Sequence, residues 1–249
     1  MAGHSQFKNI MYRKGAQDAK RAKAFTKIIR ELTVAARAGG ADPGANPRLR
    51  SAVIAAKAAN MPKDTMDRAI RRGSGADDGV QFEEVRYEGY GPGGVALIVE
   101  ALTDNRNRTA SEVRAAFGKH GGTLGETGSV SFQFDRVGLI HYPPDVADGD
   151  AMFEAALDAG AEDVTFGEDG HEVVCGPDDL GAVRENLEQR FGPSQSARLD
   201  WRANNSIPVG EKDAETLFKL LNVLDDNDDV QRIAANYDID DEMMEHLGA

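Results

Sequence analysis

The sequence has only one cysteine and no long apolar run. A single thiol cannot form an intramolecular disulfide, and Cys175 lies in the strand-like stretch 172–175, so we expect a buried, reduced thiol and a reducing cytosol. The longest apolar runs, such as residues 93–99, fall far short of the roughly 20 residues that a membrane helix needs. Residues 1–5 lack the apolar stretch of a signal peptide. We therefore expect a cytoplasmic protein with no membrane partner.

Patterns of catalytic and metal-binding residues are also missing. The five histidines are scattered without metal-ligand spacing, and neither a Gly-x-Ser-x-Gly nor a His-Glu-x-x-His pattern occurs. The acidic segment 225–229 begins like a calcium loop, but Val230 stands where glycine is required and Asn236 where a bidentate Glu belongs. A solvated acidic turn is expected there. The sequence thus predicts no enzyme, no cofactor, no metal ion and no small-molecule substrate.

What the sequence does have is a strong charge asymmetry. Residues 1–75 hold 16 of the 29 Lys and Arg residues against five acids, a net charge of +11, whereas the remainder carries 13 basic and 37 acidic residues, a net charge of −24. Such a division is typical of a basic end that contacts a polyanion and an acidic body that is repelled from it. The alternative is a basic helical bundle that is merely solvated.

The first 79 residues are predicted to form a basic helical bundle. Apolar residues recur at helical spacing between Gln17 and Ala38, and Gly39 ends that helix. A second helix should begin at Asn46 and Pro47, with Asn46 as its N-cap, and a third should follow Pro62. Lys23, Lys27, Arg30 and Arg37 align on a second face of the first helix, which is expected to stay in solvent.

From residue 80 onward, strands alternate with helices, including expected strands at 85–90, 95–102 and 129–134 and a helix opened by a capping box at Thr109. Residues 137–202 have the βαββαβ order of a ferredoxin-like domain. The helix at 213–224 and the strand at 230–237 are too few to stand alone, so they should return to the sheet of the middle domain. The predicted fold is therefore multidomain α+β: an N-terminal helical bundle (1–79), a discontinuous middle domain (80–136 and 203–240) and an inserted domain (137–202), both α+β domains being ferredoxin-like.

The most informative motif is the run of cations in the first 30 residues. Each exposed cation there can displace a counterion from a phosphate backbone. Phe7 and Tyr12 lie among these cations and either stack on bases or pack in a core. Because the expected second helix is Ala-rich and the 39–45 turn is long, generic backbone contact is favoured over a helix-turn-helix that reads a sequence. The candidate nucleic-acid-binding residues in this segment are Lys8, Arg13, Lys14, Lys20, Arg21, Lys23, Lys27 and Arg30.

Two further segments are candidates for contacts. Arg106 and Arg108 are expected in a loop before a helix N-terminus, a favourable place for an anion, although pairing with local acids is an equal alternative. The Gly-rich segment 89–94 lacks the Lys-Ser/Thr of a Walker loop and is expected to be a tight turn between strands. Its exposed residues form a possible partner surface, namely Tyr90, Gly91, Gly93 and Gly94.

Seven segments, in order along the chain, resemble the hallmarks of the YebC/PmpR family. They are residues 1–5, 13–20, 25–28, 60–63, 87–94, 104–109 and 224–230. The resemblance implies an N-terminal helical domain and two α+β domains, the third inserted in the second, with nucleic-acid contacts at the matching N-terminal cations and at the 104–109 segment. One departure is Gln6-Phe7, where the family pattern usually has Lys-Trp.

The resemblance also implies a function. Bacterial members of the family are named as DNA-binding transcriptional regulators, a mitochondrial relative is a translational activator, and bacterial members have also been proposed to act on ribosomes. The leading prediction is a DNA-binding transcriptional regulator. The first alternative is a translation factor bound to ribosomal RNA, with the ribosome as its partner. The second is a protein-interaction scaffold that uses the acidic body, which leaves the basic segment without a role.

Overall fold

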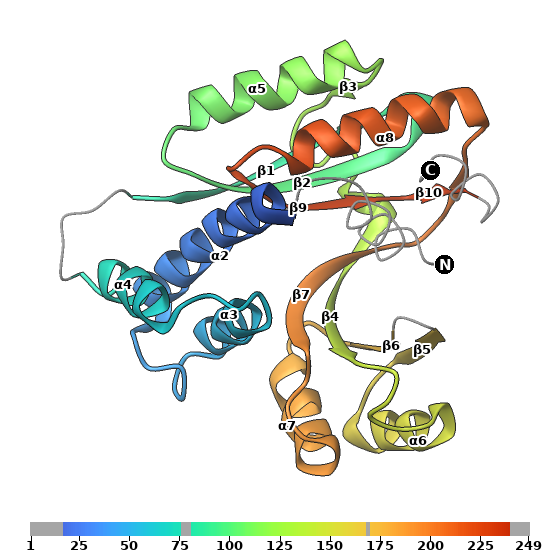
Figure 1. The fold of residues 1–249 in the computed structure, drawn as a ribbon. Helices are drawn as coiled ribbons and strands as arrows, with labels where there is room; N and C mark the ends of the chain where they lie inside the picture. Colours follow the sequence, from blue (N-terminus) through green and yellow to red (C-terminus); the bar gives the residue numbers. More distant parts are fainter. Residues whose placement is uncertain (1–16, 76–80, 168–169, 240–249) are drawn as a thin grey trace. The chain divides into compact units, whose positions relative to one another are not determined.

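The computed structural model of the protein describes residues 17–75, 81–167 and 170–239, with side chains described from residue 21 onward. The chain forms two compact units. One combines the chain up to Arg30 with residues 79–135 and the chain from 203 onward, and the other combines residues 31–78 with 136–202. Figure 1 shows the elements of each unit.

Three helices form the N-terminal region: α2 (Gln17–Gly39), α3 (Pro47–Ala58) and α4 (Lys63–Gly73). Asn46 caps α3 as predicted, since its side chain accepts a hydrogen bond from Leu49 N–H at 3.1 Å. On the apolar face of α2, Leu32, Ala35 and Ala36 are buried. The last turn of α4 packs tightly against α2, because a Cβ placed on Gly73 would lie 2.2 Å from the carbonyl oxygen of Thr33.

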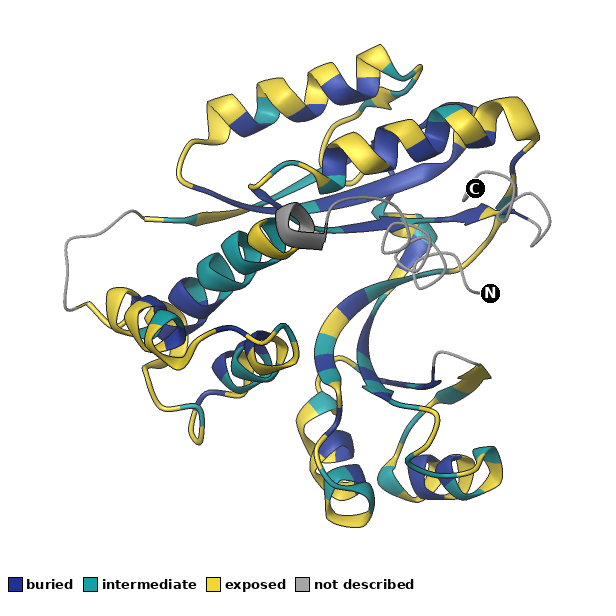
Figure 2. Ribbon diagram, in the orientation of Figure 1, coloured by how far each residue is buried: buried dark blue, intermediate teal, exposed yellow. Residues whose placement is uncertain are grey.

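The middle domain is a four-stranded sheet in the order β3-β1-β2-β9, covered on one face by two helices (Figure 1). Its elements are β1 (Glu83–Tyr90), β2 (Ala96–Thr103), α5 (Arg106–Lys119), β3 (Thr123–Leu124), α8 (Glu211–Asp225) and β9 (Val230–Ala235). Strand β9 pairs with β2, which confirms that the C-terminal helix and strand return to this sheet. Apolar residues of β2, α5, α8 and β9 form the core, and Figure 2 shows β2 buried along most of its length.

The inserted domain has a four-stranded sheet in the order β5-β6-β4-β7, the ferredoxin-like arrangement predicted from its sequence. Its elements are β4 (Phe134–Tyr142), α6 (Gly149–Ala159), β5 (Asp163–Gly167), β6 (Gly170–Cys175), α7 (Leu180–Phe191) and β7 (Ser196–Ala203). A separate core of residues between Ile140 and Ala197 holds it together. Cys175 is a free, fully buried thiol as expected, and burial raises its pKa to about 11.

The multidomain α+β class is confirmed, and the strand order of the middle domain differs from the ferredoxin-like order of the insert. One local expectation, the strand at 129–134, is wrong. Ser131–Gln133 forms a 3-10 turn instead of a strand, and β4 starts only at Phe134. A short parallel pair, β8 (Ile207–Pro208) with β10 (Tyr237–Asp238), was not anticipated. The residue bounds of the three domains stay a prediction.

Candidate nucleic-acid interface

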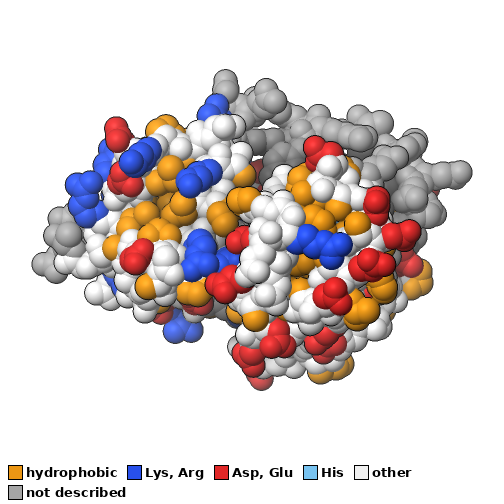
Figure 3. Space-filling view, turned by 90° about the horizontal axis from the view of Figure 1, so that it is seen from below, with side chains coloured by type: hydrophobic (Ala, Val, Ile, Leu, Met, Phe, Trp, Pro, Cys, Tyr) orange, Lys and Arg blue, Asp and Glu red, His pale blue; other side chains and the backbone are white. Residues whose placement is uncertain are grey.

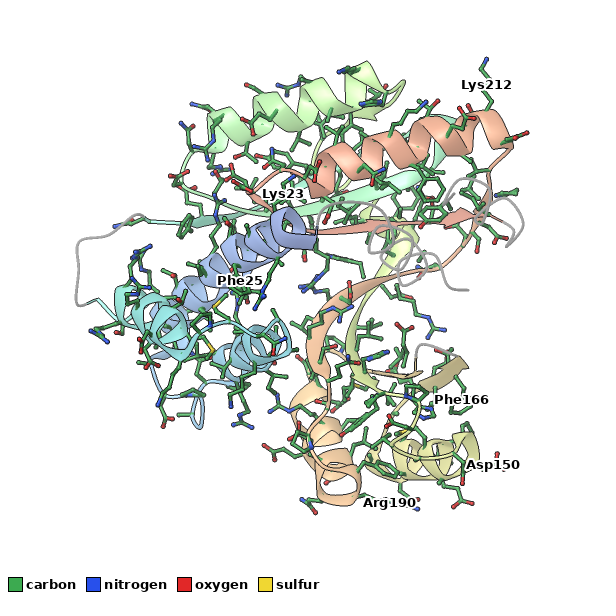
Figure 4. The ribbon with its side chains drawn as sticks, in the orientation of Figure 1. Lys23, Phe25, Asp150, Phe166, Arg190 and Lys212 are labelled. Atoms are coloured by element: carbon green, nitrogen blue, oxygen red, sulfur yellow. The ribbon has the colours of Figure 1, made fainter. Side chains whose placement is uncertain are left out.

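Three of the predicted cations of α2, Lys23, Lys27 and Arg30, pair with acidic side chains of the same unit. Lys23 Nζ lies 2.5 Å from Asp226 Oδ1, and Lys27 Nζ donates to both the side chain and the carbonyl oxygen of Asp225, at 2.9 and 2.7 Å. The Lys27 side chain is only 16% exposed. Figure 4 labels Lys23 on the N-terminal half of α2. The acidic turn after α8 is therefore a binding partner of α2 within the same unit, and not the purely solvated turn that the sequence predicted.

Arg30 is held even more firmly. Its guanidinium donates to the carboxylate of Asp229 and to the Leu102 carbonyl oxygen at 2.8 Å, and it lies over the ring of Phe82 at 5.2 Å. Only 14% of the side chain is exposed. The expectation that Lys27 and Arg30 face solvent is therefore wrong, because their acidic partners, about 200 residues away in the sequence, are brought next to them by the fold.

Asp229 collects hydrogen bonds from four side chains. Arg108 donates to both of its oxygens at 3.1 and 2.8 Å, and Thr103 and Thr109 donate at 3.1 and 2.6 Å. Burial alone would raise the pKa of the Asp229 carboxyl, but the hydrogen bonds from Arg108, Thr109 and Arg30 lower it to about 2. The carboxylate is thus ionised, and both of its oxygens accept hydrogen bonds within the protein.

The 104–109 segment is also arranged differently from the prediction. Asn105, and not Thr109, is the N-cap of α5, so Arg106 and Arg108 lie in the first helical turn and not in a loop. Hydrogen bonds to Asp229 and Asp104 raise the pKa of the Arg108 guanidinium, which is therefore a structural cation. Arg106 stays 65% exposed, with Glu83 as its partner at 3.6 Å. Of the two arginines, only Arg106 presents most of its side chain to solvent.

The remaining N-terminal candidates are only partly described. Lys8, Arg13 and Lys14 lie outside the described residues, and Lys20 belongs to α2 but its side chain is not described. Arg21 is exposed, and its guanidinium lies over the Phe25 ring at 5.5 Å. Whether these cations act together on a polyanion remains the prediction made from the sequence.

The structure shows a further set of exposed cations outside the candidate nucleic-acid-binding residues, and of these only Arg37 was expected to face solvent. They lie on the C-terminal half of α2 and on α3 and α4, and the described part of the chain provides no hydrogen-bond or ion-pair partner for their side chains. The packing of Gly73 on Thr33 and Ala36 carries the last turn of α4 next to the α2 turn that bears Arg37. Figure 3 shows Lys and Arg side chains gathered over these helices. The set, here called the helical cations, is Arg37, Lys57, Lys63, Arg71 and Arg72.

These cations flank a short helix–turn–helix connection between α3 and α4. Only residues 59–62 separate the two helices; Asn60 has a positive φ of 55° and Met61 is buried. The helix-turn-helix prediction concerned the longer connection between α2 and α3. The Asn60-Met61-Pro62-Lys63 segment, which was already noted as part of the family resemblance, was the available signal.

The Gly-rich turn is built mainly to join β1 and β2. Gly91 is buried, and a Cβ there would lie 2.7 Å from Leu97 Cδ1. The expectation that Gly91 belongs to an accessible surface is therefore wrong. Gly93 and Gly94 are exposed and have positive φ values of 71° and 76°, which favour glycine. Tyr90 is 38% exposed, and its hydroxyl donates to the Ser129 carbonyl oxygen at 3.2 Å. An accessible surface therefore remains at Tyr90, Gly93 and Gly94.

The described residues lack two other kinds of feature. These residues contain no group of three or more His, Cys, Asp or Glu side chains placed to hold a metal ion. Within the same ranges, no helix has the length and apolar character needed to cross a membrane.

Comparison with known proteins gives matches over almost the whole chain. The family described as the TACO1/YebC protein N-terminal domain matches residues 5–76, and the family described as the TACO1/YebC second and third domain matches residues 82–237. Among solved structures, a conserved hypothetical protein from Aquifex aeolicus is 48% identical, with a TM-score of 0.85 over 90% of this chain and 93% of that one.

Proposed function

Because the chain belongs to the TACO1/YebC family, we propose that it is a nucleic-acid-binding regulator of gene expression. The observation that carries this proposal is the set of helical cations, which are exposed and have no partner among the described residues, in a chain whose net charge is −13. A local cation cluster on an acidic protein is the arrangement that attracts a phosphate backbone while it limits contact to one surface. The helical cations form the proposed contact surface.

Within this class, the leading proposal is a DNA-binding transcriptional regulator, the role that the sequence resemblance implies for bacterial members. The four-residue connection between α3 and α4 supports it, because a helix that follows a short turn is the usual element placed in the major groove.

The second candidate is a translation factor that binds ribosomal RNA. The exposed face of α4 favours it, since Lys63, Arg71 and Arg72 suit phosphates and α4 carries no Asn or Gln for bidentate adenine contacts. Such a surface suits an RNA helix, which is recognised mainly by shape and backbone.

A charge-removal experiment tests the nucleic-acid contact itself. Arg71→Gln with Arg72→Gln should weaken binding to a labelled duplex about tenfold at low salt and reduce the magnitude of the slope of log K against log salt by about 2. The matched control removes two exposed lysines from α8, Lys212→Gln with Lys219→Gln, and should change affinity less than about twofold. Equal losses in both variants would reject the helical cations as the contact surface.

A competition experiment separates the two candidate roles. Protein from a gentle lysate is run through a sucrose gradient at several salt concentrations, with excess duplex DNA or nuclease added. Co-migration with ribosomal particles that DNA does not displace would reject the promoter-binding role and support translation. Absence from the particles, with salt-sensitive retention of one duplex over scrambled competitors, would establish a transcription factor.

A further inference from the structure

The inserted domain has a surface that the nucleic-acid proposal leaves unused. Residues 137–202 contain 15 acids, four arginines and no lysine, a net charge of −11. Among the described residues of this acidic domain four large apolar side chains are exposed: Phe153 by 50%, Leu157 by 63% and Phe166 by 50%, which lie on or beside α6, and Leu199 on β7 by 37%. Figure 3 shows apolar patches among the acidic side chains on this domain. Exposed aromatic and leucine side chains in one small area are typical of a binding surface.

The apolar side chains form one row along α6. Residues 149, 153 and 157 are four apart and so lie on one side of the helix, over about 12 Å. The ring of Phe166 covers the start of this row, because a Cβ on Gly149 would lie 3.6 Å from it. An edge-to-face contact with His171, at 5.7 Å between ring centroids, holds the Phe166 ring in place. Phe166 therefore lies at the Gly149 end of the row that Phe153 and Leu157 continue along α6.

A second row, of carboxylates, runs beside the apolar one. Asp150, Glu154 and Asp158 follow the three positions of the apolar row by one residue each, and all three are exposed. No side chain or backbone group in the described ranges makes a hydrogen bond or ion pair to their carboxylates. Figure 4 labels Asp150 on α6 and Phe166 on β5. An open groove of about 270 Å³ between α6 and α7 adjoins the acidic row, lined by Ala155, Asp158, Ala159, Asn186, Gln189 and Arg190.

We propose that the α6 face of the inserted domain, formed by Phe153, Leu157, Phe166, Asp150, Glu154 and Asp158, docks a basic amphipathic helix of a partner protein. The parallel rows match a helix whose apolar stripe is flanked by Lys or Arg, as in other helix-in-groove complexes. Charge complementarity decides the class of partner. A nucleic acid or an anionic membrane is repelled by the acidic row, and a two-fold contact with a second copy would bring equal acidic rows together.

This proposal does not depend on the function of the helical cations, because it concerns another surface and a protein ligand. The probe is a fluorescein-labelled 18-residue peptide of Leu and Lys that forms an amphipathic helix, titrated into the full-length protein and followed by anisotropy. A peptide of the same composition in scrambled order should bind about tenfold more weakly. Amide chemical shifts of the labelled protein should change mainly in α6 and β5.

Single substitutions locate the contact. Glu154→Lys should weaken binding about tenfold and Leu157→Ser about fivefold, in line with central interface residues. The matched controls lie in the other unit: Glu126→Lys makes the same charge change in an exposed loop, and Val223→Ser removes an exposed apolar side chain from α8. Both should change affinity less than twofold. Thermal melts establish that each variant is folded, which is expected because all four side chains are exposed.

The outcomes are decisive in either direction. Equal losses for Glu154→Lys and Glu126→Lys would show that the peptide responds only to net charge, and the proposal would be rejected. Changes in amide chemical shift centred outside α6 and β5 would also reject the proposal, and so would equal affinity for the scrambled peptide. Selective losses at Glu154 and Leu157 would establish the docking face.

Discussion

At the level of single residues, Asp229 joins two sequence motifs that are 120 residues apart. Its carboxylate accepts hydrogen bonds from Thr109 and Arg108 of the 104–109 motif, and Asp229 itself is the last acid of the 224–230 motif. Because Arg30 of α2 also pairs with it, one buried carboxylate connects three segments of the chain. The acidic motif therefore has a structural function, whatever else it does.

We predict that Asp229→Asn lowers the free energy of unfolding at pH 7 by about 3 kcal/mol, because it leaves two guanidinium groups without their shared counter-charge. The pH dependence should change as well. The folded pKa of about 2 lies below the ordinary aspartate value near 4, so the unfolded state binds the proton more readily between these values. The lowered pKa of Asp229 therefore contributes about 2 kcal/mol to the free energy of unfolding above pH 4, and this contribution is lost as the pH falls toward 2.

Urea unfolding from pH 7 to pH 2 measures both effects. The difference in the free energy of unfolding between the wild type and Asp229→Asn should shrink as the pH falls from about 4 to about 2. Asp226→Asn is the control, because Asp226 is 63% exposed and its pair with Lys23 should contribute less than about 1 kcal/mol. If the difference in free energy of unfolding stayed constant between pH 4 and pH 2, the loss of stability in acid could not be assigned to Asp229.

At the level of elements, the pairing of α2 with the turn after α8 gives Lys27 a structural role. We predict that Lys27→Asp lowers stability by about 1 kcal/mol and that adding Asp225→Lys recovers most of the loss, because the swapped charges can pair again. The double variant keeps the net charge of the protein. Its affinity for nucleic acid should therefore equal that of the wild type within about twofold.

Chemical denaturation and filter binding on the wild type, both single variants and the double variant check this prediction. If Lys27 contacts a phosphate, the double variant will regain stability but its affinity for nucleic acid will stay low. That result would show that Lys27 contacts the nucleic acid.

The contact between α4 and α2 gives a prediction about packing. Gly73→Ala should destabilise the protein by about 2 kcal/mol, because the new Cβ would lie 2.2 Å from the backbone oxygen of Thr33. Gly181→Ala, at a helical position of α7 with nothing within 4 Å, should instead stabilise by about 0.5 to 1 kcal/mol. Thermal unfolding of the two variants measures the contrast, and equal effects would contradict close packing at Gly73.

These elements also show what the sequence can predict. The cap at Asn46, the apolar face of α2 and the order of the inserted domain follow from local rules and periodicity, and all were predicted. The partners of Lys27 and Arg30 were not, because a charge on a helix face carries no record of an acid some 200 residues away. Of the helical cations, only Arg37 was expected to face solvent, because the exposure of the cations on α3 and α4 depends on how these helices pack and not on local composition. Local composition identifies a basic segment, but only the tertiary contacts show which cations remain free.

At the level of the whole molecule, the insert has its own core and its own charge. The core of the middle domain contains no residue of 137–202, and the core of the insert lies entirely within that range. The two ends of the insertion are adjacent, because Asn204 N–H donates to the Gln133 carbonyl oxygen at 2.9 Å. The insert can therefore be removed without opening the middle sheet, and its removal takes away a net charge of −11.

We predict that replacing residues 137–202 by a short Gly-Ser linker leaves the middle domain folded and speeds association with nucleic acid at low salt. The physical reason is that the insert repels a polyanion over the Debye length, about 10 Å at 0.1 M salt, so the acceleration should disappear as salt rises. Stopped-flow fluorescence with a labelled duplex measures the association rate, and amide spectra of residues 81–135 and 203–239 verify the fold. The same shortened chain should lose binding of the Leu and Lys peptide entirely. Slower association or lost affinity in a folded variant would mean that the insert itself contacts the nucleic acid, and its acidic α6 face would then be only one side of a bifunctional domain.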